Sequence, residues 1–413
     1  MNVSNPLREL IAARRPGFNL DAPFYTAEEI HDLDMEVIFG RHWIYVGVEP
    51  DIPEPGDYFT VKLGRASIVV VRDDDMTVRA FHNVCRHRGA QLCAEQTGSV
   101  GNLVCPYHHW TYDLTGKLIH NEHMGEDFDC GNHGLKPVHV GNIAGLIFIC
   151  LADEPPADFA EMKDAMEPYI APHGIADCKV VYQDDYIEAG NWKLTMENNR
   201  ECYHCVGNHP ELTQSLYEFG FGYQPSPTNA EAVQQFCELV DSEHARWESI
   251  GVKSAEIEKL DGRATGFRVR RLPLDRAGES QTMDAKVACH KLLGELTERR
   301  LGGLSFWTQP NSWHHFMSDH IVTFSVQPID VGHTLVRTKW LVHKEAMEGR
   351  DYDLQRLTEV WLATNRQDGA LVEMSQRGVI SPAFAPGPYS PYTERLVDKF
   401  ANWYIERLRA ALD

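Results

Sequence analysis

Two short stretches, Cys85-Arg86-His87 and Cys105-Pro106-Tyr107-His108, decide how this sequence is interpreted. Each stretch supplies one cysteine and one histidine, and seventeen residues separate the two stretches. An iron–sulfur cluster in which two histidines replace two cysteines on one iron needs this set of ligands. Neutral histidines leave such a cluster less negative than four thiolates would, so its reduction potential rises. The pattern therefore predicts a cluster that accepts electrons and passes them on.

Structural zinc is the alternative, because zinc also binds two cysteines and two histidines. Zinc sites usually repeat a Cys-x-x-Cys pair ahead of a histidine pair, whereas each half of this motif mixes the two residue types. The motif, with its neighbours Arg88-Gly89 and Pro106-Tyr107, resembles that of the Rieske [2Fe–2S] family. The resemblance implies that the cysteines bind one iron and the histidines the other. The implied ligands are Cys85, His87, Cys105 and His108.

Composition limits the class of protein. The chain has 413 residues, enough for two or three domains, and its net charge of −21 argues against a general role in binding nucleic acid or anionic membranes. Its ten cysteines are scattered, which favours a reducing cytoplasm over a disulfide framework. The N-terminus has no apolar signal-peptide core, and no apolar run approaches the length of a transmembrane helix. We therefore expect a cytoplasmic protein.

The hydrophobic pattern predicts an α+β fold, because strands and long helices occur without regular βαβ alternation. We expect an N-terminal helical segment over 1–42 that packs on the last domain, a small β-domain with the cluster over 43–151, and a larger domain over 152–413. Consecutive prolines at 155 and 156 favour the second boundary. Expected helices are 27–40, 159–170, 351–377 and 393–412; expected strands are 58–63, 66–72, 77–83, 145–151, 180–189, 321–328 and 334–342.

A second metal site is indicated by His204 and His209. A spacing of five suits two ligands where a helix ends and the chain turns, and Gly207 and Pro210 favour such a break. Two imidazoles and one carboxylate form the facial triad of non-haem Fe(II) oxygenases, whose open positions admit O₂ beside a substrate. Asp368, within the late helix, is our choice for the carboxylate. Glu359 and Glu373 are the alternatives.

Glu201 precedes His204 by three residues, and ligating histidines usually donate their second N–H to a carboxylate. The two motifs, in this order and separation, resemble the catalytic α-subunit of Rieske non-haem iron oxygenases over nearly the entire chain. The resemblance implies a bridging acid at Glu201 and iron ligands at His204, His209 and Asp368. It also implies a small all-β Rieske domain and a catalytic domain with an antiparallel sheet and long C-terminal helices, of the helix-grip (START-like) type.

The resemblance further implies how electrons travel. The family is commonly trimeric, and the cluster of one subunit serves the iron of the next. The implied bridge, His108–Glu201–His204, would cross a subunit interface with Glu201 as its centre. The chain has no Gly-x-Gly-x-x-Gly nucleotide fingerprint, so we expect a separate NAD(P)H-dependent reductase. Glutamate at position 201, where the family more often has aspartate, resembles the branch that acts on quaternary ammonium compounds.

A quaternary ammonium group is recognised by aromatic faces. Aromatic residues are dense over 304–316, and others lie beside a predicted iron ligand and near the C-terminus, although each could equally be a core residue. Candidates for an aromatic cage are Tyr203, Phe306, Trp307, Trp313 and Tyr389. The resemblance implies a monooxygenase that hydroxylates an N-methyl group of a betaine and releases formaldehyde, with proline betaine (stachydrine) favoured over glycine betaine. The alternatives are a ring-hydroxylating dioxygenase acting on an aromatic acid and a zinc-containing binding protein with no redox role.

Overall fold

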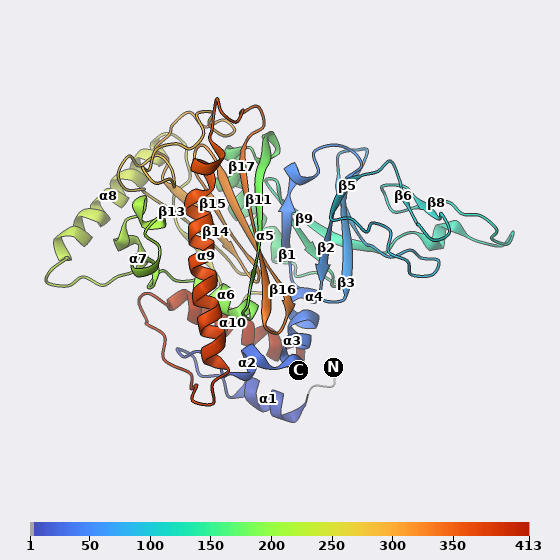
Figure 1. Ribbon diagram of the computed structural model, residues 1–413, viewed down its shortest axis with the longest axis horizontal. Helices are drawn as coiled ribbons and strands as arrows, with labels where there is room; N and C mark the ends of the chain where they lie inside the picture. Colours follow the sequence, from blue (N-terminus) through green and yellow to red (C-terminus); the bar gives the residue numbers. More distant parts are fainter. Residues whose placement is uncertain (1–3, 413) are drawn as a thin grey trace.

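The computed structural model describes residues 4–412 and has the expected α+β class. Two seven-stranded sheets and one three-stranded sheet make up its β-structure, and every pairing between named strands is antiparallel (Figure 1). Among residues 4–412, no helix is long and apolar enough to cross a membrane.

The first seven-stranded sheet has the order β1-β10-β9-β4-β3-β2-β5. Its inward side chains are mostly Val, Ile and Phe, and β10 is buried along its whole length. The three-stranded sheet β6-β7-β8 extends from it and carries the second cluster motif. The bounds are β1 (Ile44–Val48), β2 (Asp57–Leu63), β3 (Ala66–Arg72), β4 (Val78–His82), β5 (Thr97–Ser99), β6 (Leu103–Val104), β7 (Thr111–Tyr112), β8 (Leu118–His120), β9 (Pro137–Ile143) and β10 (Leu146–Cys150).

The second sheet has the order β11-β17-β16-β15-β14-β13-β12, and the long helix α9 lies across one of its faces (Figure 1). Helix α9 also packs against α6, which ends shortly before the predicted histidines His204 and His209. The strands are β11 (Cys178–Glu188), β12 (Ile257–Lys259), β13 (Phe267–Leu272), β14 (Gly303–Thr308), β15 (Ser312–Phe316), β16 (Ile321–Asp330) and β17 (His333–His343).

All four expected helices are present, and the structure adds others that the sequence did not predict. The expected helix 27–40 is formed by α3, a π-helical turn and α4, and expected 159–170 matches α5. Helix α8 was not expected, although Val233, Phe236 and Val240 recur at helical spacing along it. The bounds are α1 (Asn5–Ala12), α2 (Pro23–Thr26), α3 (Glu28–Leu33), α4 (Phe39–Arg41), α5 (Phe159–Ile170), α6 (Trp192–Asn199), α7 (Cys205–Asn208), α8 (Ala230–Ser249), α9 (Leu354–Val379) and α10 (Arg395–Leu412).

A buried polar cluster attaches the N-terminal segment to the rest of the chain. Asp34 forms an ion pair with Lys193, and both side chains are fully buried. The Tyr404 hydroxyl (2.7 Å) and the Trp192 indole N–H (2.9 Å) also donate to Asp34. Since a buried charge is costly unless it is paired and hydrogen-bonded, this arrangement fixes α6 against both the N-terminal segment and α10. Helix α6 leads directly into the predicted iron site.

Candidate metal centres and substrate cavity

Two loops with the same hydrogen-bond pattern carry the four predicted cluster ligands. The Gly89 N–H donates to the Cys85 carbonyl, and the His109 N–H donates to the Cys105 carbonyl, each over 3.0 Å. Gly89 (φ 76°) and His109 (φ 57°) occupy corresponding positions with left-handed backbone. Glycine adopts this conformation without cost, whereas histidine does so only where the surroundings impose it. The motif spacing therefore encodes two copies of one tight turn.

The chemistry of these side chains fits the cluster. The rings of His87 and His108 lie 4.6 Å apart, and both Nδ1 atoms are buried without a hydrogen-bond partner among the described residues. Buried polar atoms are normally paired, so two orphaned Nδ1 atoms side by side indicate metal ligands. The Tyr112 hydroxyl lies 3.4 Å from the Cys85 Sγ, where it can donate to a ligating thiolate. Trp110 stacks on His87 at 4.7 Å and shields one side of the loop pair.

The predicted iron ligands converge although α9 lies far along the chain from the histidines. His204 immediately precedes the short helix α7, and His209 immediately follows it. Their Nε2 atoms are 3.0 Å apart, and the Asp368 Oδ1 lies 3.2 Å from the first and 3.0 Å from the second. Ligands at right angles on a metal, each about 2.1 Å from it, lie about 3 Å apart. Asp368, rather than Glu359 or Glu373, supplies the carboxylate at this point.

Both histidines are oriented through their other ring nitrogen. The Nδ1 of His204 lies 2.5 Å from the Glu201 Oε1, and the Nδ1 of His209 lies 2.9 Å from the Gln367 Oε1. An acceptor at Nδ1 places the proton there and leaves Nε2 free for a metal. Glu201 therefore lies where the sequence predicted it. The sequence did not single out Gln367 as a partner of His209. Its position directly before Asp368 is the feature that could have indicated this role.

The pKa values of these three side chains indicate that the site holds a proton when no metal is bound. Burial lowers the pKa of His204, but hydrogen bonds and charges from Asp368 and Glu201 outweigh burial and raise it to about 9. For His209, burial again opposes Asp368, and the net direction of the pKa is upward. Burial alone would raise the pKa of Asp368, yet the two histidines lower it. A cation at the centre of these groups would replace the shared proton.

The three side chains open into a cavity of about 400 Å³. Of the five aromatic residues predicted as a cage, Trp307 lines it. The structure does not bring the other four there. Tyr203 is 61% exposed, Phe306 is buried in the core, Trp313 stacks on Phe324, and Tyr389 packs between the N-terminal segment and the C-terminal region.

The alternation of side chains along β14 explains why Trp307 lines the cavity and Phe306 does not. Successive side chains of β14 point to opposite faces, so Trp307 and Ser305 face the cavity while Phe306 faces the core. Two arginines of β13 share the cavity face, since Arg268 pairs with Trp307 and Arg270 with Ser305 across the strands. Further lining side chains missed from sequence are His315, Trp361, Tyr217, Phe221, Phe236 and Tyr392. The i, i+2 spacing of the arginines was the signal that could have found them.

A disulfide joins Cys202 and Cys205 on either side of Tyr203-His204. From the scattered positions of the ten cysteines we expect reduced thiols. That expectation is wrong for this pair, since three residues of separation and the turn before α7 bring their Cα atoms within 4.9 Å. The other eight cysteines are free.

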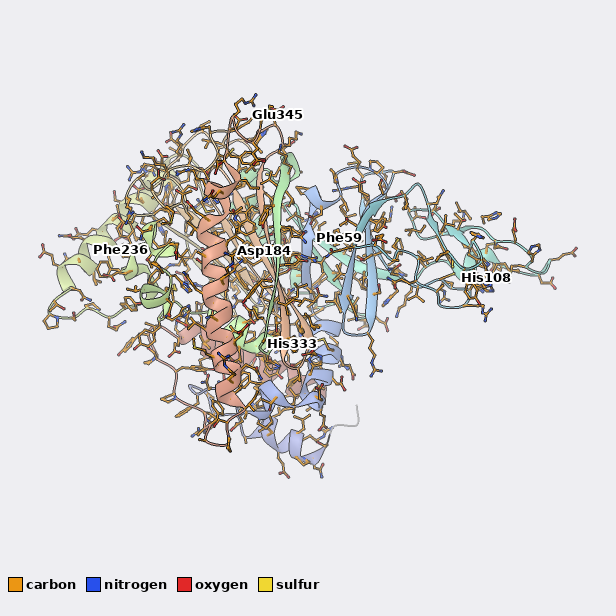
Figure 2. All side chains as sticks on the ribbon, viewed as in Figure 1. Phe59, His108, Asp184, Phe236, His333 and Glu345 are labelled. Carbon is orange, nitrogen blue, oxygen red and sulfur yellow. A yellow bond between two sulfur atoms is a disulfide. The ribbon has the colours of Figure 1, made fainter. Side chains whose placement is uncertain are left out.

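The cluster loops and the cavity lie at opposite ends of the molecule. Figure 2 labels His108 at the right-hand end of the long axis and Phe236, which lines the cavity, at the left-hand end. The cluster loops belong to the first and third sheets, whereas the cavity is built on the second. One subunit therefore does not place its own two metal centres next to each other.

Family models match both parts of the chain. Residues 42–140 match the Rieske [2Fe-2S] domain, and residues 175–410 match the catalytic domain of the ring hydroxylating alpha subunit. The glycine betaine monooxygenase oxygenase subunit of Chromohalobacter salexigens is 44% identical over 98% of this chain and 89% of its own length. The chain belongs to the family of Rieske oxygenase catalytic subunits. It is an oxidoreductase with a [2Fe–2S] cluster, a mononuclear iron and O₂ as co-substrate, and the zinc alternative is wrong.

Solved structures agree on the fold. The quaternary ammonium Rieske monooxygenase CntA in complex with L-carnitine superposes with a TM-score of 0.68 at 23% identity, covering 97% of this chain and 98% of that one. Naphthalene 1,2-dioxygenase from a Rhodococcus species superposes with a TM-score of 0.70 at 20% identity, covering 99% of each. Both structures therefore share the fold of this chain.

Proposed function

We propose that this chain is the oxygenase subunit of a monooxygenase that N-demethylates a small betaine, with proline betaine and glycine betaine as the first substrates to test. Iron held by His204, His209 and Asp368 would supply activation of O₂ with two electrons. Hydroxylation of an N-methyl group gives an N-hydroxymethyl ammonium, which separates into formaldehyde, a proton and the tertiary amine. The observation that carries the proposal is that this histidine–carboxylate triad opens into a cavity that is also lined by Trp307 and Arg270, whose side chains suit a cation and an anion.

Arg270 is the proposed partner of the betaine carboxylate. Its guanidinium donates to the Gly220 carbonyl (3.0 Å) and lies 3.6 Å from Glu256, so most of its five donors are free for a ligand. Burial, together with the charge of neighbouring Arg268, lowers the pKa of Arg270. A bound carboxylate would relieve this electrostatic cost. Arg268 is less available, because it makes closer contacts of 2.8 Å to Glu256.

The apolar part of the cavity suits the cationic end of a betaine. Trp361 and His315 stack at 4.4 Å, and both line the cavity with Trp307. The Arg268 guanidinium lies 4.9 Å from the centre of the Trp307 ring and covers one of its faces. The other aromatic surface remains for the substrate, where each cation–π contact gives roughly 0.5–2 kcal/mol. Together with Arg270, these rings would hold both ends of a zwitterion.

Electrons would enter from a separate NAD(P)H-dependent reductase and cross between subunits of a homotrimer. Glu201 is the proposed bridge, because its carboxylate contacts His204 and its partly buried side chain lies in the turn before α7, two residues from the exposed Tyr203. The separation of His108 from the cavity within one subunit supports transfer to the next subunit (Figure 2). Sedimentation equilibrium of the iron-loaded protein tests the trimer, and a monomer with full activity would contradict it.

A single turnover tests the function without the reductase. The iron-loaded protein is reduced chemically, freed of reductant and exposed to O₂ with proline betaine or glycine betaine, and formaldehyde and the demethylated amine are measured. Stoichiometric formaldehyde from one betaine supports the proposal and identifies the substrate. A cis-diol from an aromatic acid, with no formaldehyde from either betaine, would support the dioxygenase alternative instead.

Arg270→Met tests the carboxylate partner. We expect KM for the betaine to rise about 10- to 100-fold, because a charged hydrogen-bonded partner contributes roughly 1.5–3 kcal/mol. Choline, which has no carboxylate, serves as the internal comparison and should lose little. Arg65→Met, in the exposed turn between β2 and β3, is the matched control. Equal losses for betaine and choline would remove Arg270 from this role.

A further inference from the structure

The disulfide between Cys202 and Cys205 encloses the proposed iron ligand His204. Both cysteines line the cavity, so a small oxidant or reductant that enters the cavity reaches the bond. Nothing in the proposed demethylation uses this pair. The sulfur–sulfur bond beside the proposed iron site therefore has no role in that reaction.

Cys205 is placed to become an iron ligand. Its Sγ lies 4.0 Å from the Nε2 of His204, and its side chain is buried. The ligand atoms of His204, Cys205 and His209 all lie within 4.8 Å of one another. A disulfide sulfur carries no charge and is a poor ligand, whereas a thiolate binds divalent iron strongly. The oxidation state of the pair thus decides whether a fourth protein ligand exists.

We propose that Cys202 and Cys205 form a redox-responsive gate on the mononuclear iron. In the disulfide state Cys205 is held off the metal, and the positions for O₂ and substrate stay open. A small dithiol reduces the bond, which gives two protein thiols and the cyclic disulfide of the reductant. Cys205 then loses its proton, binds the iron and closes one open position. Hydrogen peroxide reverses the change, converting two thiols into the disulfide and two waters.

The proposal uses the proposed iron site but not the identity of the substrate. The three ligand atoms keep separations of 3.0–3.2 Å while the disulfide is closed, so the bond is compatible with an assembled triad. Its test needs no betaine, and failure of the demethylation assay leaves the gate untouched. Failure of the gate likewise leaves the demethylation proposal intact.

The test combines thiol labelling with spectroscopy of the ferrous site. Before Fe(II) is added, the protein is divided into dithiothreitol-treated and peroxide-treated portions, and each portion is freed of reagent and then loaded with Fe(II) under anaerobic conditions. Alkylation and mass spectrometry count free thiols in the peptide that contains residues 201–209. Nitric oxide is then added at limiting concentration, and the electron paramagnetic resonance signal of its adduct with the mononuclear iron is measured. We expect dithiothreitol to produce free thiols at Cys202 and Cys205. In that portion the nitric oxide signal should be at least about tenfold lower than in the peroxide-treated portion.

Variants separate the gate from general damage. Cys202→Ser leaves Cys205 without a partner and should give the low signal in both portions. Cys205→Ser and the double variant should give the high signal in both, because no thiolate is available. Cys237→Ser removes an exposed cysteine of α8 and should behave as the unmodified protein. A disulfide that peroxide cannot form, or a high signal from Cys202→Ser, would overturn the proposal.

Discussion

The two metal centres of this chain are built in opposite ways. The cluster site uses two copies of one tight turn, whose cysteine carbonyls each accept an N–H four residues later. The iron site joins His204 to Asp368 across 164 residues, with the histidines flanking α7 and the aspartate on α9. The first is therefore a local structure that its own sequence specifies. The second exists only when the catalytic sheet and its helices have packed.

Their supporting contacts differ in the same way. The cluster loops are supported by neighbours such as Tyr112 and Trp110 from the adjoining short strands. The iron site is supported by Glu201 and Gln367, which come from two different helical regions. A substitution at one metal centre should therefore leave the other centre intact. The size of the effect should also differ between the two centres. Four experiments test this contrast.

The largest effect is expected from His209→Ala. Removal of a direct ligand should abolish binding of the mononuclear iron and lower turnover by more than about 100-fold, since even the partners of metal ligands contribute 10- to 100-fold. The visible spectrum of the cluster should not change. Metal analysis and absorbance measure both, with the exposed His290→Ala as control. Loss of the cluster together with the iron would break the contrast between the two centres.

A smaller loss is expected from Glu201→Gln. The amide oxygen can still accept from His204, so the iron should stay bound while the charge of the proposed bridge disappears. We expect turnover to fall about 10- to 100-fold. Stopped-flow oxidation of the reduced cluster by O₂ should slow in parallel, with Glu238→Gln on α8 as control. Normal cluster oxidation with slow product formation would assign Glu201 to orienting His204 alone.

Iron binding should depend on pH at the catalytic site. Because burial is outweighed by Asp368 and Glu201, the pKa of His204 in the metal-free site is about 9, and iron must displace that proton. Apparent Fe(II) affinity should therefore fall about tenfold for each pH unit below 9. Anaerobic calorimetry of the apo catalytic site in buffers of different ionisation enthalpy measures the proton released. An affinity independent of pH between 7 and 8.5 would show that the histidine is already neutral.

The smallest effect is expected at the cluster. Tyr112→Phe removes the hydroxyl that lies 3.4 Å from the Cys85 Sγ. A hydrogen bond to a cluster sulfur stabilises the reduced state, so its loss should lower the reduction potential. One neutral hydrogen bond contributes about 1 kcal/mol, which corresponds to about 40 mV for one electron. Protein-film voltammetry measures the shift, and an unchanged or higher potential would mean that the hydroxyl does not donate to the sulfur.

Local patterns explain what could be predicted. Strand β3 and helix α5 match their expected ranges because alternation and amphipathic spacing are properties of neighbouring residues. The cluster ligands could be predicted for the same reason, because they lie in two short motifs. Asp368 is different: the sequence offered it beside Glu359 and Glu373, and its contact with the histidines depends on where α9 packs.

The cavity shows what sequence could not provide. Aromatic density suggested Phe306 and Trp313, but strand phase and ring stacking turn both away from the cavity. The arginines of β13 reach it because their strand pairs with β14 in one register. A shift of one residue would have placed the opposite side chains there.

The sequence by itself determined the two ligand motifs, the α+β class and the existence of two iron centres, since each depends on short spacings and on residue chemistry. Tertiary structure alone decided three things: that the Asp368 carboxylate meets the two histidines, that Arg270 and Trp307 line the same cavity, and that Cys205 lies beside His204. The physical reason is that packing of helices on a sheet sets distances between residues far apart in the chain, and no local pattern encodes those distances.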